Sequence, residues 1–279
     1  MYEDNNKLYN NLSEDIILEK INHLVIPFDK TWKKVSVNLS GGADSALCTY
    51  LLCQIIQKYN LSTTIEIITY QRCWTGRPWQ GDIAQNVYMW LKNKFPKIIG
   101  KRHLCYIPPE LEHGVIGNIV NNRSGDMIIV GSFNKFAAYT YGFDAVFNAT
   151  SKNPSVEEDC ELKQRAMDNR NVDVKKAHIG EVWFVDKTTK FAHCHPFKFV
   201  EKDWIIAQYY MLDILDLLKI TRSCEGDINH NQIVKDACEH YTKYNKGMHI
   251  PECGECWWCL ERNWAMTRVP EMIKEINEF

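Results

Sequence analysis

The chain has 279 residues, of which 45% are hydrophobic and 24% charged, with a formal net charge of -2. This composition is ordinary for a soluble globular protein, and no apolar run reaches the roughly 20 residues that span a bilayer. We therefore expect no membrane association. Without a long basic run, a large nucleic acid is not the expected partner. The polar segment 1–7 lacks a signal-peptide pattern, so the expected location is the cytoplasm.

Strand and helix patterns alternate through the first half of the chain. The alternating apolar residues of 35–39 predict a strand, and the spacing of Leu47, Leu51 and Ile55 predicts an amphipathic helix after it. The same reasoning predicts strands over 64–70, 102–107 and 144–149, and helices over about 83–95 and 127–141. Repeated strand–helix units predict an α/β fold with a doubly wound parallel sheet. Ligands of such folds bind at the carboxyl ends of the strands.

The second half of the chain is less regular. Residues 150–159 are polar and rich in turn formers, and a long connection of this kind is often functional. An apolar piece over 182–185 resembles a strand, and helices are expected from about 202 to 212 and at the C-terminus. His193 and His195 share one face of an extended segment, which alone is weak evidence for a metal site.

The sharpest local signal is the string Ser40-Gly41-Gly42-Ala43-Asp44-Ser45 between the first strand and its helix. A glycine pair at that junction lets a phosphate approach the backbone, and the amides and dipole of the helix start favour an anion. The two serines add hydroxyl donors, and Asp44 adds a carboxylate that suits Mg²⁺ beside phosphates. The string is neither a Walker A loop nor a dinucleotide-binding fingerprint.

A second strong signal is Cys253-Gly-Glu-Cys256-Trp-Trp-Cys259, in which two overlapping Cys-x₂-Cys steps bring three thiols into one turn. Such spacing predicts a structural zinc site, which needs a fourth ligand from elsewhere. Cys224 is the leading candidate for it, with Cys238 and His249 as competitors. The ferredoxin pattern fails because residue 263 is Asn, where that run requires a fourth Cys.

The loop resembles the PP-loop of the ATP pyrophosphatases, and loop and cysteines together resemble the 7-cyano-7-deazaguanine synthases of queuosine precursor synthesis. The resemblance covers about residues 33–270. It also rests on Gly142–Asn148, on the Asp159-Cys160 pair, on the helix start Lys202–Ile205, on Thr221–Cys224 and on Cys259-Leu-Glu-Arg262. It implies an adenine nucleotide α-hydrolase-like domain over 1–195, with a substrate loop at about 148–172. It further implies a helical zinc-binding extension over 196–279.

The resemblance implies an ATP-dependent C–N ligase. A carboxylate, 7-carboxy-7-deazaguanine, would be adenylated, and ammonia would give the amide and then the nitrile. ATP, Mg²⁺ and Zn²⁺ are the implied cofactors, and a homodimer is the candidate assembly. Asp44 and Lys202 are the candidate catalytic residues. The other implied roles are pyrophosphate binding by Ser40, Gly41, Gly42, Ser45 and Lys202, substrate binding by Asn148, Asp159 and Cys160, and zinc binding by Cys224, Cys253, Cys256 and Cys259.

The chain departs from the family pattern in three places. Ala46 replaces the usual Thr, residues 152–158 replace the usual Gly-rich substrate loop, and 28 residues separate Cys224 from Cys253. Two other functions are therefore kept. One is a PP-loop sulfurtransferase or tRNA-modifying ligase using Cys73 or Cys160. The other is a zinc-stabilised nucleotide-binding module without catalysis.

Overall fold

A computed structural model describes residues 13–22, 24–72, 79–107, 125–157, 160–164, 170–172, 182–185, 191–224 and 252–278. Within this part of the chain, six strands form one sheet in the order β5-β4-β3-β6-β8-β7. The strands are β3 (Lys34–Asn38), β4 (Thr64–Arg72), β5 (Ile99–Ile107), β6 (Ala145–Phe147), β7 (Trp183–Val185) and β8 (Ala192–Cys194). All neighbouring strands pair in parallel except β7, which is antiparallel to β8 at one edge.

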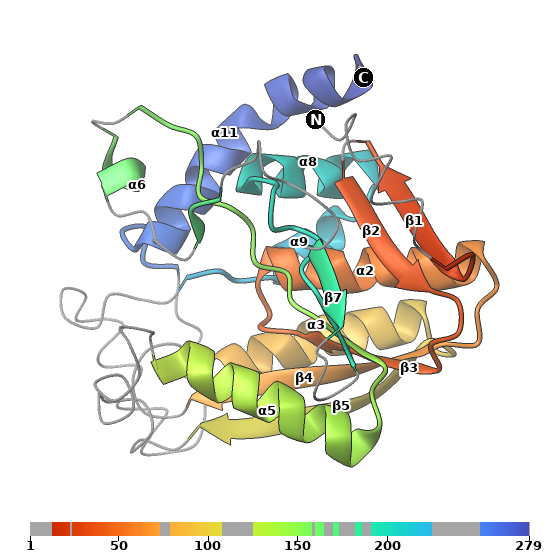
Figure 1. Ribbon diagram of the computed structural model, residues 1–279. Coiled ribbons are helices and arrows are strands. Elements are labelled where there is room, and N and C mark those ends of the chain that lie inside the picture. The colour runs from red at the N-terminus through yellow and green to blue at the C-terminus, as the bar shows by residue number, and fades with distance from the viewer. Residues whose placement is uncertain are drawn as a thin grey trace.

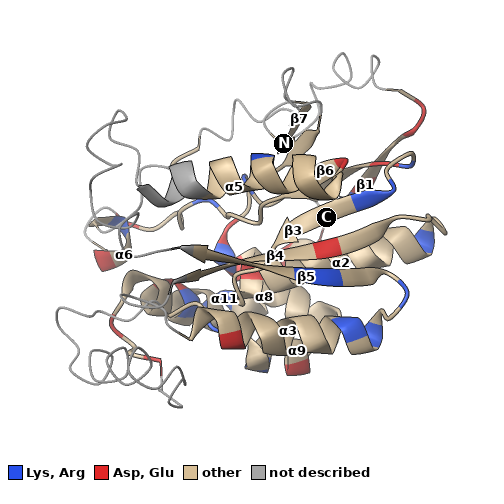
Figure 2. Cartoon of the chain, turned by 90° about the horizontal axis from the view of Figure 1, so that it is seen from below, with Lys and Arg blue, Asp and Glu red and all other residues tan. Residues whose placement is uncertain are grey.

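Helices cover both faces of this sheet, as Figure 2 shows from its edge. On one face, α2 (Ala43–Lys58) and α3 (Gln80–Lys94) bury the alternate strand residues Val35, Val37 and Ile67. On the other face, α5 (Gly125–Tyr141) packs in the apolar cluster of Ile68 and Val146. The two-residue period of the strands sends neighbouring side chains to opposite faces, so both faces of the sheet are apolar.

The C-terminal helices form a further layer beside α2 and α3 (Figure 1). They are α8 (Lys202–Met211), α9 (Leu215–Ile220) and α11 (Trp257–Asn277). Helix α11 packs along α8, which in turn packs on α2. One stripe of α11 is buried at helical spacing, and it comprises Trp257, Glu261, Ala265, Val269, Met272 and Ile276. This packing brings the C-terminal part of the chain over the start of α2.

An antiparallel hairpin precedes the sheet and was not predicted. It consists of β1 (Ile16–Ile21) and β2 (Leu24–Asp29), which are joined through Asn22 with a φ of 55°. The Phe28 ring lies 6.3 Å from the ring of Phe147, between centroids, so the hairpin joins the main core. The Pro in β2 weakened its strand pattern, because proline lacks an amide hydrogen for pairing.

The predicted α/β fold is confirmed, with one refinement. The strands expected from the alternating pattern are β3 to β6, but the apolar piece over 182–185 pairs antiparallel, so the sheet is mainly rather than wholly parallel. The three-residue strand β8 was too short to predict from periodicity. Among the described helices, none has the length and apolar character needed to cross a membrane.

Candidate functional site

The loop between β3 and α2 has the geometry of an anion cradle. Gly41 has a φ of 81°, a conformation that favours glycine. Gly42 is the N-cap of α2, and no side chain caps the first amides of the helix. The Ser45 hydroxyl donates to the Gly42 carbonyl oxygen at 3.1 Å and accepts from the Ser40 amide at 3.2 Å. These bonds close the loop around the helix start, where the dipole favours negative charge.

Gly41 packs directly against the first turn of α3, with no room for a side chain. An added Cβ at Gly41 would lie 2.8 Å from the Ala84 amide nitrogen and 2.8 Å from Ile83 Cγ2. A side chain therefore does not fit at residue 41 without movement of α3. The glycine is required by its positive φ and by its contact with the next helix.

Asp44, in the first turn of α2, forms an ion pair with Lys202, which is the first residue of α8. The lysine is only 1% exposed, so its ammonium group is held out of water by the surrounding helices. Its second anionic neighbour is Glu261 of α11, whose Oε2 lies 3.8 Å from the lysine Nζ. Two residues 158 positions apart, both expected to serve the phosphates, are thus brought together by the packing of α8 on α2.

Glu261 is fully buried and joins this pair to the 148–172 segment. Its Oε1 accepts a 2.5 Å hydrogen bond from Arg170 Nη2. Burial raises the pKa of the Glu261 carboxyl, and the nearby Lys202 and Arg170 oppose that rise. The Arg170 guanidinium also donates to the carbonyl oxygens of Ser151 and Lys152, at 2.7 and 2.8 Å. One buried arginine therefore anchors the expected substrate segment to α11.

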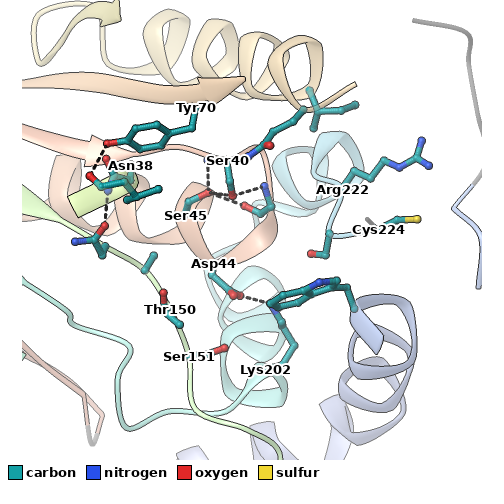
Figure 3. Close-up of a pocket in the computed structure, with 18 of the residues that line it drawn as sticks. Asn38, Ser40, Asp44, Ser45, Tyr70, Thr150, Ser151, Lys202, Arg222 and Cys224 are labelled. Carbon is teal, nitrogen blue, oxygen red and sulfur yellow. Dashed lines mark hydrogen bonds and ion pairs between the residues drawn. The ribbon is translucent and has the colours of Figure 1, made fainter. Parts of the chain in front are cut away.

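Asp44, Lys202 and Arg170 line a pocket of about 270 Å³ at the carboxyl edge of the sheet (Figure 3). Its floor is the phosphate loop with Ser40, Asp44 and Ser45. One wall comes from the strand ends, one from residues 148–151, and one from 222–224 with Trp79 and Trp258. Hydroxyl, amide and charged side chains make up most of the lining, with Trp79, Ile83, Val130 and Trp258 as apolar parts, which suits a small polar molecule such as one carrying a phosphate. The position agrees with the rule that open α/β sheets bind ligands at strand carboxyl ends.

The four expected metal ligands meet at one point. The sulfurs of Cys224, Cys253, Cys256 and Cys259 all lie within 4.8 Å of one another. The Cys253 sulfur is 3.6 Å from that of Cys224 and 3.9 Å from that of Cys259. Backbone amides of Cys253 and Cys256 donate to two of the sulfurs, at 3.4 and 3.3 Å. Hydrogen bonds from Cys256 and then Cys259 lower the pKa of the Cys224 thiol, which favours a thiolate there.

The spacing of these sulfurs fits a single ion. A tetrahedral zinc with bonds of about 2.3 Å places its sulfurs about 3.8 Å apart, and the two separations from Cys253, 3.6 and 3.9 Å, are close to that value. A four-iron cluster inserts several iron and sulfide atoms between its cysteine sulfurs and needs a wider arrangement. Four cysteine sulfurs at these separations form a donor set that could hold a metal ion, and zinc is one ion that suits it. The competing ligands Cys238 and His249 lie outside the described residues.

Backbone hydrogen bonds connect the four-cysteine cluster to the loop over 40–45. The Arg222 amide donates to the Gly41 carbonyl oxygen at 2.9 Å, and Cys224 follows two residues later. Trp79 is the N-cap of α3, and its indole nitrogen donates to the Cys224 carbonyl oxygen at 3.3 Å. Arg262, three residues after Cys259, donates to the carbonyl oxygens of Thr221 and Leu218 at 3.1 and 3.2 Å. The last carbonyls of α9 are satisfied in this way.

Seven of the thirteen expected site residues line the pocket, namely Ser40, Gly42, Asp44, Ser45, Asn148, Lys202 and Cys224. Gly41, Cys253, Cys256 and Cys259 are not among its lining residues. Asn148 is present, and its side-chain oxygen accepts a hydrogen bond from Asn38. Cys160 is half-buried just before α6 (Glu161–Gln164) and is not among the pocket residues. Asp159 lies outside the described residues, as does Cys73. Asp44, Lys202 and the phosphate loop surround one cavity, together with the Cys224 end of the metal site.

Sequence reasoning missed Arg170, Glu261 and Arg222. One signal was present for Glu261, because a carboxylate occupies a position of the apolar stripe of α11. Charged residues are almost never fully buried unless they are paired, so a partner was to be expected. Nothing in the sequence around Arg170 separates it from the other charged residues of its segment.

No known protein-family model matches the chain, and no curated protein matches it. A similar solved structure is that of the U34-tRNA thiolase NcsA from Methanococcus maripaludis with its [4Fe-4S] cluster. The two chains are 14% identical, with a TM-score of 0.45, over 98% of this chain and 78% of that one. A likeness this distant identifies neither the substrate nor the cofactor of this chain.

Proposed function

We propose that this chain is an ATP-dependent enzyme of the PP-loop type that adenylates a carboxylate, releases pyrophosphate and joins ammonia to the activated acid. The observation that carries the proposal is the Asp44–Lys202 pair on the floor of the pocket, beside the glycine loop at the start of α2. Helix-start amides and a lysine are the groups that stabilise charge building up on phosphate oxygens.

In this proposal the chain's own groups act as follows. The amides of Gly41 and Gly42 and the hydroxyls of Ser40 and Ser45 hold the pyrophosphate that leaves. Mg²⁺, when bound at Asp44, supplies positive charge to the phosphates. Lys202 neutralises further charge on the phosphates during the transfer.

The acceptor occupies the other side of the pocket in this proposal. Its carboxylate oxygen attacks the α-phosphorus, and ammonia then displaces AMP to form an amide. The acceptor that we propose is 7-carboxy-7-deazaguanine, with a second ATP converting the amide into the nitrile. Asn148 and the segment that Arg170 holds in place form the acceptor wall. The four cysteines bind a structural zinc, and residues 222–224, which end at the first of these cysteines, form the opposite wall.

The test is a mass-resolved assay with ATP, Mg²⁺, ammonium and 7-carboxy-7-deazaguanine. We expect pyrophosphate and AMP, together with a product at the amide or nitrile mass. The matched pair of variants is Asp44→Asn and Asp82→Asn, since both acids stand in the first turn of a helix and Asp82 is exposed. The first should lower the turnover rate about 100-fold or more, and the second should leave it unchanged. If this acid gives no product but ATP is still split when other acids are supplied, the deazaguanine substrate is wrong and the adenylation proposal stands.

A second candidate is a sulfur-transferring tRNA-modifying enzyme. Of the two thiols expected to carry its sulfur, Cys160 is half-buried and not among the pocket residues, and Cys73 lies outside the described residues. An ATP-dependent thiolation assay on tRNA, with RNA binding measured in parallel, tests it. Sulfur incorporated into tRNA, without any product from the carboxylate, would favour this candidate over the ligase. Tight ATP binding without pyrophosphate release in either assay would favour a nucleotide-binding module.

A further inference from the structure

Only one of the two carboxylate oxygens of the buried Glu261 accepts a hydrogen bond. Oε1 accepts the Arg170 hydrogen bond, while Oε2 has no hydrogen-bond partner among the described residues. The whole residue is 0% exposed. A buried carboxylate oxygen left unpaired is costly, and its presence calls for an explanation. The Lys202 ammonium lies 3.8 Å from it.

Lys202 therefore stands between two carboxylates. Its ammonium group donates a hydrogen bond to Asp44, and the Glu261 carboxylate lies 3.8 Å away, just beyond hydrogen-bond distance. The four groups Asp44, Lys202, Glu261 and Arg170 carry two negative and two positive formal charges, so the set is balanced in this state. An ammonium group that is 1% exposed needs an anionic partner at all times, because an unpaired buried charge is strongly destabilising.

We propose that Glu261 is a positioning residue that receives the Lys202 ammonium when Asp44 turns to a Mg²⁺-bound nucleotide. The inference rests on the proposed function, because it assumes that Mg²⁺ and ATP bind at Asp44. The movement needed is small, since the lysine has a flexible four-carbon stem. With Glu261 as its second acceptor, the lysine stays paired and keeps its place beside the phosphates. Without it, Lys202 stays on Asp44 and competes with Mg²⁺ for the same carboxylate.

The chain offers a matched control for this role. Asp203, the next residue of α8, is also buried and also pairs with α11, through a 2.9 Å contact to Arg268 Nε. Neither Asp203 nor Glu261 lines the pocket, but Glu261 lies 3.8 Å from the Lys202 ammonium, whereas the ion pair of Asp203 is with Arg268. Both Glu261→Gln and Asp203→Asn remove a charged contact between the same two helices, but only the first removes the second carboxylate beside Lys202. A role in helix docking alone predicts the same outcome for both variants.

The experiment is calorimetric titration of wild type, E261Q and D203N with ATP at several Mg²⁺ concentrations. We expect E261Q to bind Mg²⁺-ATP about tenfold more weakly than wild type, equivalent to roughly 1.4 kcal/mol, and D203N to bind like wild type. Raising Mg²⁺ should close the deficit of E261Q, because Mg²⁺ then outcompetes the lysine. The sign is diagnostic, since simple loss of a negative charge near an anion site would tighten ATP binding instead.

Unchanged or tighter ATP binding by E261Q overturns the inference, and so does equal weakening in D203N. If E261Q does not fold, the double variant R170M/E261L replaces both buried charges by apolar groups of similar size, which buried pairs often tolerate. It should show the same Mg²⁺-dependent weakening, and ATP binding like that of wild type would overturn the inference. A wild type that does not bind Mg²⁺-ATP overturns the proposed function and, with it, the inference. A wild type that binds, with E261Q unaffected, overturns the inference alone.

Discussion

The backbone amide of Arg222 donates a 2.9 Å hydrogen bond to the carbonyl oxygen of Gly41. The bond joins the phosphate loop to the segment that carries the first metal cysteine. Ser223, the next residue, also approaches Gly42, since a Cβ added there would lie 3.7 Å from the serine hydroxyl oxygen. The two strongest sequence signals, far apart in the chain, therefore form neighbouring parts of one site. We therefore expect substitutions in the cysteine cluster to weaken ATP binding at the loop.

Gly41→Ala should damage both the loop and the fold. The positive φ costs a non-glycine residue about 1–2 kcal/mol, and the added methyl group would collide with α3. We expect a loss of unfolding free energy of at least that size, together with loss of ATP binding. Urea unfolding and ATP titration measure the two effects.

Gly131→Ala is the matched control for that substitution. Gly131 lies within α5, and a Cβ there meets nothing within 4 Å. Alanine should raise the unfolding free energy by about 0.5–1 kcal/mol, because it restricts the unfolded chain and suits a helix. Equal stability of the two variants would contradict the assigned role of Gly41.

Cys256→Ser should remove the metal and loosen the pocket. We expect zinc content to fall from about one equivalent to below about 0.1, since a structural tetrahedral site needs all its ligands. Stability to urea should fall with it, because zinc binding contributes folding free energy. ATP should also bind more weakly, since Cys224 and Arg222 belong to the pocket wall. Elemental analysis, urea unfolding and calorimetry measure these three effects.

Cys105→Ser provides the comparison, because Cys105 is a half-buried thiol of β5 outside the metal cluster. It should keep its zinc and its ATP affinity. Iron with a visible absorption band in the anaerobically purified wild type, in place of zinc, would refute the assignment of the metal. Full stability of Cys256→Ser without zinc would refute its structural role.

His195 should make the fold sensitive to acid. Burial, and then the positive charges of His193 and Lys198, lowers the pKa of His195 from 6.5 to about 4. A base with a lowered folded pKa is protonated more readily in the unfolded chain. Its contribution to stability is therefore complete above pH 6.5 and is lost as the pH falls toward 4. The unfolding free energy should drop by up to about 1.4 kcal/mol per pH unit in this window.

The variant His195→Gln isolates that contribution. It lacks the titrating ring, so the difference in unfolding free energy between it and wild type should vary with pH only between about 6.5 and 4. Urea unfolding at a series of pH values measures the difference. A difference that is constant over this range would show that His195 does not titrate as described.

Local sequence patterns were sufficient to predict β3, β4 and α2, because each shows its own periodicity over enough residues. They were insufficient for β8, which has three residues, and for the antiparallel pairing of β7, which depends on a neighbour rather than on its own residues. Strand order is also absent from any local pattern. The order β5-β4-β3-β6-β8-β7 follows from how crossover helices pack on the sheet.

The sequence by itself predicted phosphate binding by the loop over 40–45 and metal binding by the cysteines over 253–259. Their function depends on residue types at close spacing, and neighbours in sequence are necessarily neighbours in space. Only the tertiary structure decided that Cys224 completes the metal site, that Lys202 reaches Asp44, and that Glu261 and Arg170 stand behind that lysine. These pairs come from helices that meet through apolar packing, and burial then makes each charge depend on a partner that no nearby residue specifies.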